Sequence, residues 1–554
     1  MNINIDIEKD INNILMPFLA VNSETATHGE KKCEKFLVGY LEGIEYFKEN
    51  PEHFGRYSID GDHLRRHVTW AMLKGEGSKT VVLIHHNDVV GVEDFKTLHH
   101  VAHNPLKLEK ELLKIADELP SEAREDLQSG DYLFGRGAAD MKGGGAIQLA
   151  LLKRYSEQKD FKGNVIVLSL PDEENLSAGM RAAVNLLDEL KSKYSLNYVH
   201  VINSEPHQRK SNNHGLISEG SVGKIMAFVY VRGYLAHVGK VFEGLNPVSV
   251  LSEIVDHTEL VHKFSDSVGG ETSPPPTWLY MRDRKTSYDV SMPLGAAGCV
   301  SFLTLDSNPA TVLSNLKDVS EHAFDSVIAR MNIRYQEFCK SMDRKAERLP
   351  WEATIVTFTE LVKEAFSNKG KVFSKEYNEK LKEINKRISL GETDLIESTF
   401  ELTEFVYNYI TDLSPRVVLG LVPPYYPNVS NLILDDRSEK AKGLFDELSD
   451  YSIQQSGTKY DREYYYTGIS DLSYFALKDS KVIEDELKNN MPLYGAAYNI
   501  PLSKIEGLSM PCMNIGPWGK DFHKMTERVY KKDLYENTPA LIDRAIKILL
   551  NQEI

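Results

Sequence analysis

Residues 80–88, TVVLIHHND, decide the fold, because a run of β-branched and aliphatic residues is followed at once by polar ones. A short apolar run of this kind predicts a strand that is buried on both faces, as in a parallel sheet. The pattern recurs at Val165–Leu170, before Asp172, and at Tyr198–Ile202, before Glu205. The spacing from Asp140 to Glu174 and on to Glu205 fits successive strand–helix units of about 30 residues.

Helical patterns alternate with these strands. Residues 146–155 predict one helix, and residues 177–193 predict another, with apolar residues at helical spacing. Ser177 is the candidate N-cap of the second helix. Strands that alternate with helices predict an α/β domain whose central sheet is mixed and mainly parallel.

The chain of 554 residues exceeds what one hydrophobic core supports, so we expect at least two domains. The pattern of strand-like and helical segments changes near residue 222, and we expect an inserted α+β domain over residues 222–345. The first domain then comprises residues 1–221 and 346–554, to which a strand-like run at 417–419 returns. Residues 346–412, which include a Lys- and Glu-rich stretch, are expected to form a helical elaboration of that domain.

Composition restricts the partners and the compartment. The 65 basic and 81 acidic residues give a net charge of −16, which disfavours nucleic acid and anionic membranes as partners, because both attract clustered Lys and Arg. The N-terminal stretch lacks the basic start of a secretory signal, and no stretch is apolar for the roughly 18 to 20 residues that span a bilayer. We expect a cytoplasmic protein. Its four cysteines, Cys33, Cys299, Cys339 and Cys512, lack CxxC spacing and are expected to be buried free thiols.

Side chains of the metal-ligand type follow the predicted strands, and ligands bind beyond the carboxyl ends of strands in open α/β sheets. A glycine-rich turn adds Asp140, and a segment near the C-terminus adds His523. The set is His86, Asp88, Asp140, Glu173, Glu174, Glu205 and His523. Zinc takes nitrogen and oxygen ligands, and a two-zinc site also needs a carboxylate that bridges the ions. The set meets both needs.

The spacing of these residues in the sequence indicates which of them bind zinc and which assist. His86 and Asp88 are two residues apart, so on an extended chain both point to one side, where the Asp88 carboxylate can accept the second N–H of a ligating imidazole and fix the ring. Adjacent glutamates cannot both face one metal from a regular strand. We therefore expect one of Glu173 and Glu174 to bind zinc and the other to take a proton from the attacking water.

The chain resembles the zinc aminoacylase, carboxypeptidase and dipeptidase family, the twentieth family of metallopeptidases, in five motifs taken in order. They are HxD at 86–88, GRGxxDMKGG at 135–144, DEE at 172–174, EP at 205–206 and His523. The resemblance covers the first 240 residues and the last 140 well, and the middle loosely. It implies a zinc-peptidase-like catalytic domain, an inserted lid domain of the dimerisation type, and two Zn²⁺ ions per chain, for which Co²⁺ or Mn²⁺ can substitute.

Carried over position by position, the resemblance implies that Asp140 bridges the two zinc ions. His86 and Glu205 then complete the ligands of one ion, and Glu174 and His523 complete those of the other. The reaction implied is hydrolysis of an amide, peptide or ureido bond in a small amino-acid-derived substrate.

Two further roles follow from the same resemblance. Glu173 becomes the general base. The lid segment RGYLAHVG at 232–239 resembles one that presents a histidine to the substrate carbonyl, often across a homodimer, so His237 is expected to donate a hydrogen bond to the developing oxyanion. Residues 468–471, GISD, resemble a turn that borders the substrate pocket.

Within the family, the chain length, the PPYYP run at 423–427 and the MPLGAAG turn at 292–298 most resemble the bacterial arginine-utilisation proteins. This implies a setting in arginine or ornithine catabolism. Many relatives carry an Asp-x-Arg in the lid whose arginine binds a substrate carboxylate, whereas this chain has Leu-Asp-Ser at 305–307. Arg282 or Arg284 could replace that arginine. Dipeptides, N-acyl amino acids and citrulline-like ureido compounds all remain open as substrates.

Several other residues have plainer interpretations. His99, His100 and His103 have helix-compatible spacing but no nearby carboxylate motif, so we expect no second metal cluster there. His85 should face away from His86 on its strand. Arg136 is expected to shape the glycine-rich turn.

Two rival functions keep the fold without the chemistry. One is a catalytically silent protein that binds an amino acid as a partner in arginine metabolism, and the other is a structural assembly subunit. The complete set of five ligand positions together with Glu173 favours the enzyme, because a silent site has no chemical need for a base.

Overall fold

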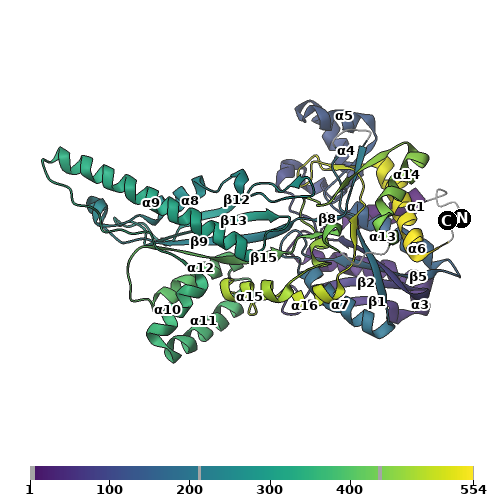
Figure 1. Ribbon diagram of the computed structural model, residues 1–554. Coiled ribbons are helices and arrows are strands. Elements are labelled where there is room, and N and C mark those ends of the chain that lie inside the picture. Colours follow the sequence, from purple (N-terminus) through teal and green to yellow (C-terminus); the bar gives the residue numbers. More distant parts are fainter. Residues whose placement is uncertain (1–6, 210–213, 435–438, 553–554) are drawn as a thin grey trace. The chain divides into compact units, whose positions relative to one another are not determined.

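The computed structural model describes residues 7–209, 214–434 and 439–552. Its contacts divide the chain into two compact units (Figure 1). The first unit comprises Met1–Ser221, Val429–Lys478 and Ser503–Ile554, and the second comprises Val222–Asn428 and Asp479–Leu502.

An eight-stranded mixed sheet lies at the centre of the first unit. Its order is β1 (Phe54–Ser58), β2 (His67–Lys74), β5 (Lys162–Leu170), β3 (Glu76–His86), β6 (Asn197–Asn203), β18 (Cys512–Asn514), β7 (His214–Ser218) and β17 (Lys459–Glu463). The neighbours β5, β3, β6 and β18 run parallel, and β2 runs antiparallel to β5. The three strands expected from the sequence are β3, β5 and β6, and the mixed sheet is confirmed.

Helices pack on both faces of this sheet (Figure 1). The helices of the first unit are α1 (Ile7–Ala20), α2 (Gly29–Glu42), α3 (Glu45–Glu49), α4 (Pro105–Lys114), α5 (Ser121–Ser129), α6 (Lys142–Ser156), α7 (Ala178–Tyr194), α13 (Glu439–Lys442), α14 (Leu444–Ser456), most of α16 (Leu502–Leu508) and α17 (Thr538–Leu550). α6 and α17 pack on β3, and Val81 and Leu83 join their core, whereas α7 packs against β1, β2 and β5. The predicted helices correspond to α6 and α7.

Ser177 precedes α7 as expected, but it does not cap the helix through its side chain. Its backbone is left-handed, with φ of 49°, and no hydrogen bond runs from the helix N–H groups to its hydroxyl. The backbone N–H of Ser177 instead donates to the carbonyl of Asp172 at 2.7 Å. The preceding loop, rather than a cap, therefore sets where α7 begins.

A small three-stranded sheet of the first unit joins distant segments. It contains β19 (Gly519–Lys520), β20 (Arg528–Tyr530) and β4 (Tyr132–Phe134) in that order. β4 precedes the glycine-rich turn, and the loop between β19 and β20 carries His523. Pairing of β20 with β4 therefore brings the C-terminal histidine segment to the glycine-rich turn.

The second unit is an α+β domain. Its five-stranded sheet has the order β12 (Thr277–Asp283), β13 (Gly295–Thr304), β9 (Gly223–Arg232), β15 (Arg416–Tyr426) and β14 (Ile355–Thr357). Its helices are α8 (Pro247–Asp256), α9 (Pro309–Ser341), α10 (Phe358–Lys369), α11 (Lys371–Ser389), α12 (Leu395–Tyr407) and α15 (Ser480–Asn490). Short strands β10 (Ser267–Val268) and β11 (Glu271–Thr272) form a separate ribbon, and β8 (Gly220–Ser221) pairs with β16 (Val429–Ser430) in the first unit.

The chain returns to the first unit later in the sequence than we expected. Residues 346–428 lie in the second unit, whereas the sequence placed residues 346–554 in the catalytic domain. The run at 417–419 belongs to β15, which pairs antiparallel with β9 along Arg416–Leu421. An apolar strand pattern shows that a strand is buried but not which sheet it joins, and here it joins the inserted one.

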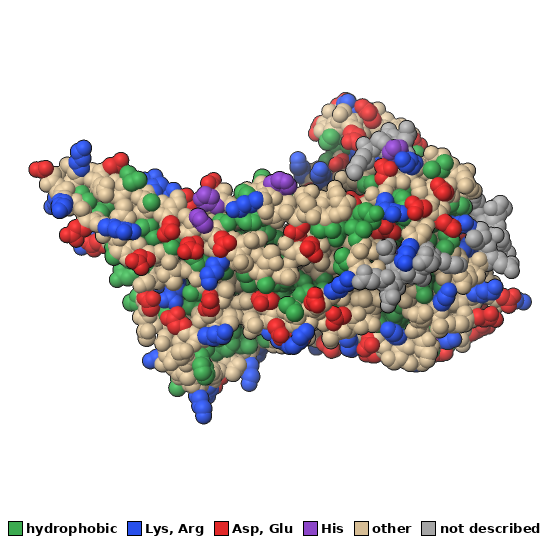
Figure 2. All heavy atoms as spheres, in the orientation of Figure 1, with side chains coloured by type: hydrophobic (Ala, Val, Ile, Leu, Met, Phe, Trp, Pro, Cys, Tyr) green, Lys and Arg blue, Asp and Glu red, His purple; other side chains and the backbone are tan. Residues whose placement is uncertain are grey.

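Surface properties agree with the charge analysis. Within the described residues no helix is both long and apolar enough to cross a membrane. On the face drawn in Figure 2, basic and acidic side chains are interspersed. All four cysteines are buried and unpaired, as expected.

The start of α6 requires glycine at position 144. A Cβ atom there would lie 2.2 Å from the Ser204 carbonyl oxygen, whereas one at Gly39, near the end of α2, would meet nothing within 4 Å. We therefore expect Gly144→Ala to lower the free energy of unfolding by about 1 to 3 kcal/mol through overpacking. Gly39→Ala should raise it by about 0.5 to 1 kcal/mol through helix propensity. Urea titration of both variants measures the difference, and equal effects would contradict the close packing of α6 on the segment after β6.

Candidate metal centre

The carboxyl ends of three neighbouring parallel strands meet at one edge of the first unit's sheet. His86 is the last residue of β3, Glu173 and Glu174 closely follow β5, and Glu205 closely follows β6. Adjacent parallel strands bring these side chains together although they are far apart in sequence.

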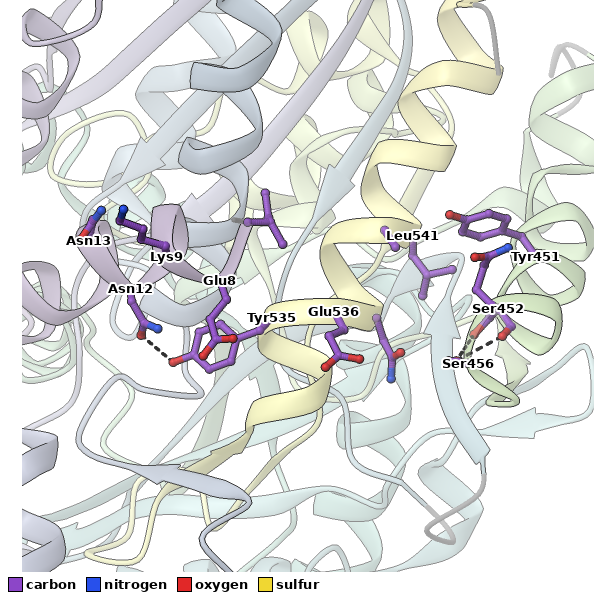
Figure 3. A pocket seen from close by; sticks show the side chains of 14 residues that line it. Glu8, Lys9, Asn12, Asn13, Tyr451, Ser452, Ser456, Tyr535, Glu536 and Leu541 are labelled. Carbon is purple, nitrogen blue, oxygen red and sulfur yellow. Dashed lines mark hydrogen bonds between the residues drawn. The ribbon is translucent and has the colours of Figure 1, made fainter. Parts of the chain in front are cut away.

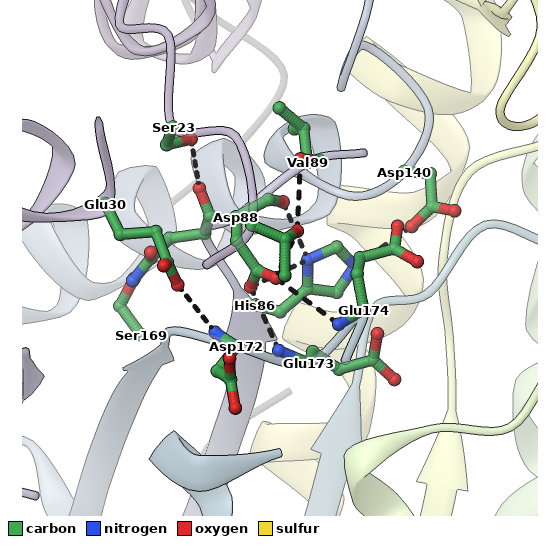
Figure 4. A network of polar contacts seen from close by, with 12 residues as sticks. Ser23, Glu30, His86, Asp88, Val89, Asp140, Ser169, Asp172, Glu173 and Glu174 are labelled. Carbon is green, nitrogen blue, oxygen red and sulfur yellow. Dashed lines mark hydrogen bonds and ion pairs between the residues drawn. The ribbon is translucent and has the colours of Figure 1, made fainter. Parts of the chain in front are cut away.

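Asp140 lies between two histidines. Its Oδ1 is 2.9 Å from His86 Nε2, and its Oδ2 is 3.2 Å from His523 Nε2. A Glu205 oxygen lies 3.6 Å from His86 Nε2, and a Glu174 oxygen lies 3.1 Å from His523 Nε2. The structure thus brings together all five residues expected as metal ligands, and Figure 4 shows His86, Asp140 and Glu174 facing one another.

The donor atoms fit divalent cations. Ligand atoms of His86, Asp140 and Glu174 lie within 4.8 Å of one another, and so do those of His86, Glu173 and Glu205. Imidazole nitrogen and carboxylate oxygen are ordinary zinc ligands, and carboxylates gathered in a buried site repel one another unless cations compensate them. The chemistry of the set therefore suits two zinc ions.

The pKa values reflect this crowding. Burial raises the pKa of Glu173 well above its usual range, and Glu205 adds to this although His86 opposes it. Burial likewise raises the pKa of Glu205, with a contribution from Asp140. Hydrogen bonds with Asp140 and Glu174 raise the pKa of His523 to about 10. The site favours positive charge, which is the property required of a cation site.

Asp88 is placed beside His86, but its carboxylate has another partner than expected. The backbone carbonyl of Asp88 lies 3.0 Å from His86 Nδ1, whereas its carboxylate is 3.7 Å away. The carboxylate instead accepts the backbone N–H groups of Glu173 and Glu174 at 3.2 and 3.3 Å (Figure 4). It also accepts the Thr25 hydroxyl at 2.9 Å. Asp88 thus orients the imidazole through its backbone and the glutamate loop through its side chain.

Glu527 holds the backbone of Asp140 in place, and the sequence analysis did not identify this residue. Its Oε1 accepts the backbone N–H groups of Ala139 and Asp140 at 3.2 and 3.3 Å, and its Oε2 lies 2.6 Å from Arg136 Nη1. Arg136 therefore does shape the glycine-rich turn. A buried ion pair between residues 391 positions apart leaves no local pattern in a sequence.

Asp471 and the turn before it also belong to this region. Asp471 is buried, and its charge contributes to raising the pKa values of Glu173 and Glu205. Burial raises the pKa of Asp471 itself to about 7. The GISD stretch at 468–471 therefore lies near the carboxylates in the first unit.

His237 lies in the second unit, in an exposed turn after β9, at the N-cap of the 3-10 helix Val238–Glu243. Its Nδ1 accepts the backbone N–H of Gly239 at 3.0 Å. An imidazole that accepts at Nδ1 carries its hydrogen at Nε2 in the neutral form. His237 can therefore act as a hydrogen-bond donor, as its expected role requires.

Arg284, one of the two arginines considered for binding a substrate carboxylate, already forms ion pairs with two glutamates. Its guanidinium lies 2.7 Å from both Glu397 and Glu404, whereas Arg282 is half exposed and 3.6 Å from Glu397. The turn at 305–307 is also satisfied within the unit, because the Asp266 carboxylate accepts its three backbone N–H groups.

Three other histidines make local contacts. His99 and His100 are exposed, and the Nδ1 of each lies within 3.0 Å of a backbone carbonyl of its own turn. His85 points away from His86 and lies 2.9 Å from Gln148 Oε1. Within residues 7–209, 214–434 and 439–552, both groups with metal-ligand geometry contain His86.

A cavity of about 600 Å³ lies elsewhere in the first unit, between α1, α14 and α17 (Figure 3). Its lining includes Glu8, Asn12, Tyr535 and Glu536, but none of the candidate ligands. This cavity is separate from the metal centre.

Two known proteins match over nearly the whole chain, and another matches over part of it. The model of peptidase family M20/M25/M40 matches residues 116–541. Uncharacterized protein YqjN of Bacillus subtilis is 32% identical over 545 residues, covering 97% of this chain and 96% of that protein. Protein RocB of the same bacterium is 28% identical over 539 residues, covering 96% and 93%. A succinyl-diaminopimelate desuccinylase of Shewanella piezotolerans is 28% identical over 211 residues, covering 37% and 47%.

Solved structures share the fold. A tripeptidase from Staphylococcus aureus has a TM-score of 0.52 at 13% identity, covering 98% of this chain and 99% of that one. The M20 family metallo-carboxypeptidase Sso-CP2 from Sulfolobus solfataricus has a TM-score of 0.52 at 12% identity, with the same coverage. The resemblance inferred from the ordered motifs is confirmed: this chain belongs to peptidase family M20/M25/M40 and is a metal-dependent hydrolase of carbon–nitrogen bonds.

Proposed function

We propose that this protein is a dinuclear zinc hydrolase that cleaves an amide, peptide or ureido bond in a small amino-acid-derived substrate. The contact of the two Asp140 oxygens with two different histidines is the observation that carries the proposal. His86 and Glu205 would hold one zinc ion, and Glu174 and His523 the other, with Asp140 shared. Such a pair of ions, when bound, polarises a carbonyl oxygen and makes water more acidic.

Glu173 moves the proton in this proposal. It takes a proton from the attacking water and delivers it to the leaving nitrogen. Its side chain is mostly buried, and its backbone N–H is fixed by Asp88. Burial raises the pKa of Glu173, so its carboxylate accepts a proton more readily than an exposed glutamate does.

His237 supplies the remaining polar contact, a hydrogen bond from Nε2–H to the oxygen that becomes negative during attack. The surface around it favours a homodimer formed through the second unit. Leu235, Val238 and Val241 are each about half exposed beside His237, and a partner subunit would cover them.

Similarity to known proteins supports a metabolic role, and the ion pairs of the second unit bear on the substrate class. The resemblance of the PPYYP and MPLGAAG stretches to the bacterial arginine-utilisation proteins supports a role in arginine or ornithine catabolism. Engagement of Arg284 by two glutamates argues against a fixed carboxylate clamp at that position, which leaves dipeptides, N-acyl amino acids and ureido compounds such as citrulline as substrates. Four buried free cysteines suit the reducing cytoplasm.

Removal of metal tests the centre itself. We expect about two Zn²⁺ ions per chain by elemental analysis, and loss of all hydrolysis on chelation, with Co²⁺ or Mn²⁺ restoring part of it. Each ion present at 100 times its dissociation constant should stabilise the fold by about 2.7 kcal/mol, so chelation should lower the Tm. Protein that carries no metal, and whose Tm does not respond to zinc, would support the silent amino-acid-binding alternative.

The adjacent glutamates give a matched pair of variants. Glu173→Gln should keep both zinc ions and lose about 10²- to 10⁴-fold in kcat, because it removes proton transfer. Glu174→Gln should weaken one zinc site. A screen of dipeptides, N-acyl amino acids and citrulline, with Glu173→Gln as the blank, identifies the substrate class. An active Glu173→Gln protein would refute the assigned base.

Mixing of variants tests His237 and the dimer together. His237→Ala should keep its zinc and lose about 10²- to 10³-fold in kcat. His322→Ala, an exposed control on α9, should keep both its zinc and its kcat. If His237 acts on the partner subunit, remixing equal amounts of Glu173→Gln and His237→Ala subunits should restore about one quarter of the wild-type rate, because half the dimers are mixed and each has one complete site. A rate no higher than the average of the two variants means that His237 does not act across a dimer.

A further inference from the structure

The loop that carries Glu173 and Glu174 is closed on itself by Asp172. Asp172 has a left-handed backbone with φ of 71°, its carbonyl accepts the Ser177 N–H at 2.7 Å, and its carboxylate accepts the Ala178 N–H at 3.2 Å. A left-handed backbone is unfavourable for a non-glycine residue and persists only where its surroundings fix it. The surroundings of Asp172 therefore determine where the two glutamates lie.

Those surroundings are a buried network of charges. Arg66 Nη1 lies 2.7 Å from Asp172 Oδ1 and 2.8 Å from Glu30 Oε2, and Arg66 Nη2 lies 2.7 Å from Asp62 Oδ1. Glu30 Oε1 accepts the backbone N–H of Asp172 at 2.9 Å, as Figure 4 shows. The side chains of Arg66, Glu30 and Asp172 are 5% exposed or less, so water competes little for these contacts.

The fold supplies the network from two separate elements. Strand β2 pairs antiparallel with β5, with Thr69 opposite Ser169, and continuing that register by three residues places Arg66 opposite Asp172. Glu30 comes from the first turn of α2. Besides Asp88, the loop is therefore held by Arg66, one residue before β2, and by Glu30 on α2, and neither β2 nor α2 carries a candidate metal ligand.

We propose that Arg66 and Glu30 are positioning residues, which hold Asp172 and through it set the places of Glu173 and Glu174 in the metal centre. This inference rests on the proposed function, because it gives the two glutamates their roles as base and ligand. A buried ion pair contributes little net stability, since desolvation offsets the attraction, but it does fix geometry. Removing Arg66 leaves three buried carboxylates uncompensated and also lowers the stability of the fold, so the zinc sites and the loop are measured directly.

The test compares Arg66→Met with Arg154→Met in protein freed of metal and titrated with Zn²⁺. Arg154, on α6 in the same unit, pairs with Asp10 at 2.9 Å, away from the loop, and serves as the control. Loss of a group that orients ligands typically costs about 10- to 100-fold in metal affinity or activity, so we expect Arg66→Met to weaken one of the two zinc sites by that factor. We also expect kcat to fall by the same order with a smaller change in KM, and Arg66→Lys to recover part of both. Arg154→Met should match the wild type.

Hydrogen–deuterium exchange of the metal-free protein gives a readout that needs neither zinc nor substrate. Backbone amides of residues 172–178 should exchange faster in Arg66→Met and in Glu30→Gln than in the wild type or in Arg154→Met. If Arg66→Met does not fold, Arg66→Lys and Glu30→Gln provide the same comparison. A wild-type protein that binds no zinc overturns the proposed function and this inference together. Wild-type zinc affinity and loop exchange in the Arg66 and Glu30 variants overturn this inference alone.

Discussion

The proposed metal centre depends on a single carboxylate whose two oxygens face different histidines. Asp140 contacts His86 through Oδ1 and His523 through Oδ2, so both histidine segments must approach it from separate directions. Glu527 holds the backbone N–H of Asp140 in place, and Gly144 lets α6 approach the segment after β6 closely. The rest of the first unit can be understood as the support that this geometry requires.

Such a site has an electrostatic cost that the fold alone does not remove. Four carboxylates, those of Asp140, Glu173, Glu174 and Glu205, surround His86 and His523, and burial raises the pKa values of the three glutamates. Divalent cations supply the compensating charge, and ligands that come together only in the folded chain couple metal binding to folding. The same excess of negative charge that makes the centre costly without metal gives it affinity for cations.

The sequence predicts those parts of the centre that depend on local pattern. Strand β3 ends at His86 because an apolar run ends there, and the polar ends of β5 and β6 follow the same rule. It does not predict that β15 pairs with β9, because a buried strand looks alike in either sheet. Nor does it predict the contacts of Arg66 or Glu527, since ion pairs between distant segments leave no periodicity. The carbonyl of Asp88, rather than its side chain, lies nearest His86 Nδ1, a choice that two-residue spacing alone does not make.

Charge within the second unit has consequences for recognition. Asp266 already occupies the backbone donors of the 305–307 turn, and Glu397 and Glu404 already neutralise Arg284. A guanidinium shared by two carboxylates would have to exchange one of them for a substrate carboxylate, with no gain in the number of ion pairs. His237, by contrast, has an exposed ring whose Nδ1 is engaged and whose Nε2 carries a hydrogen in the neutral form. Within the second unit, His237 can thus donate a hydrogen bond without losing a partner, whereas Arg284 would have to give up a glutamate to bind a substrate carboxylate.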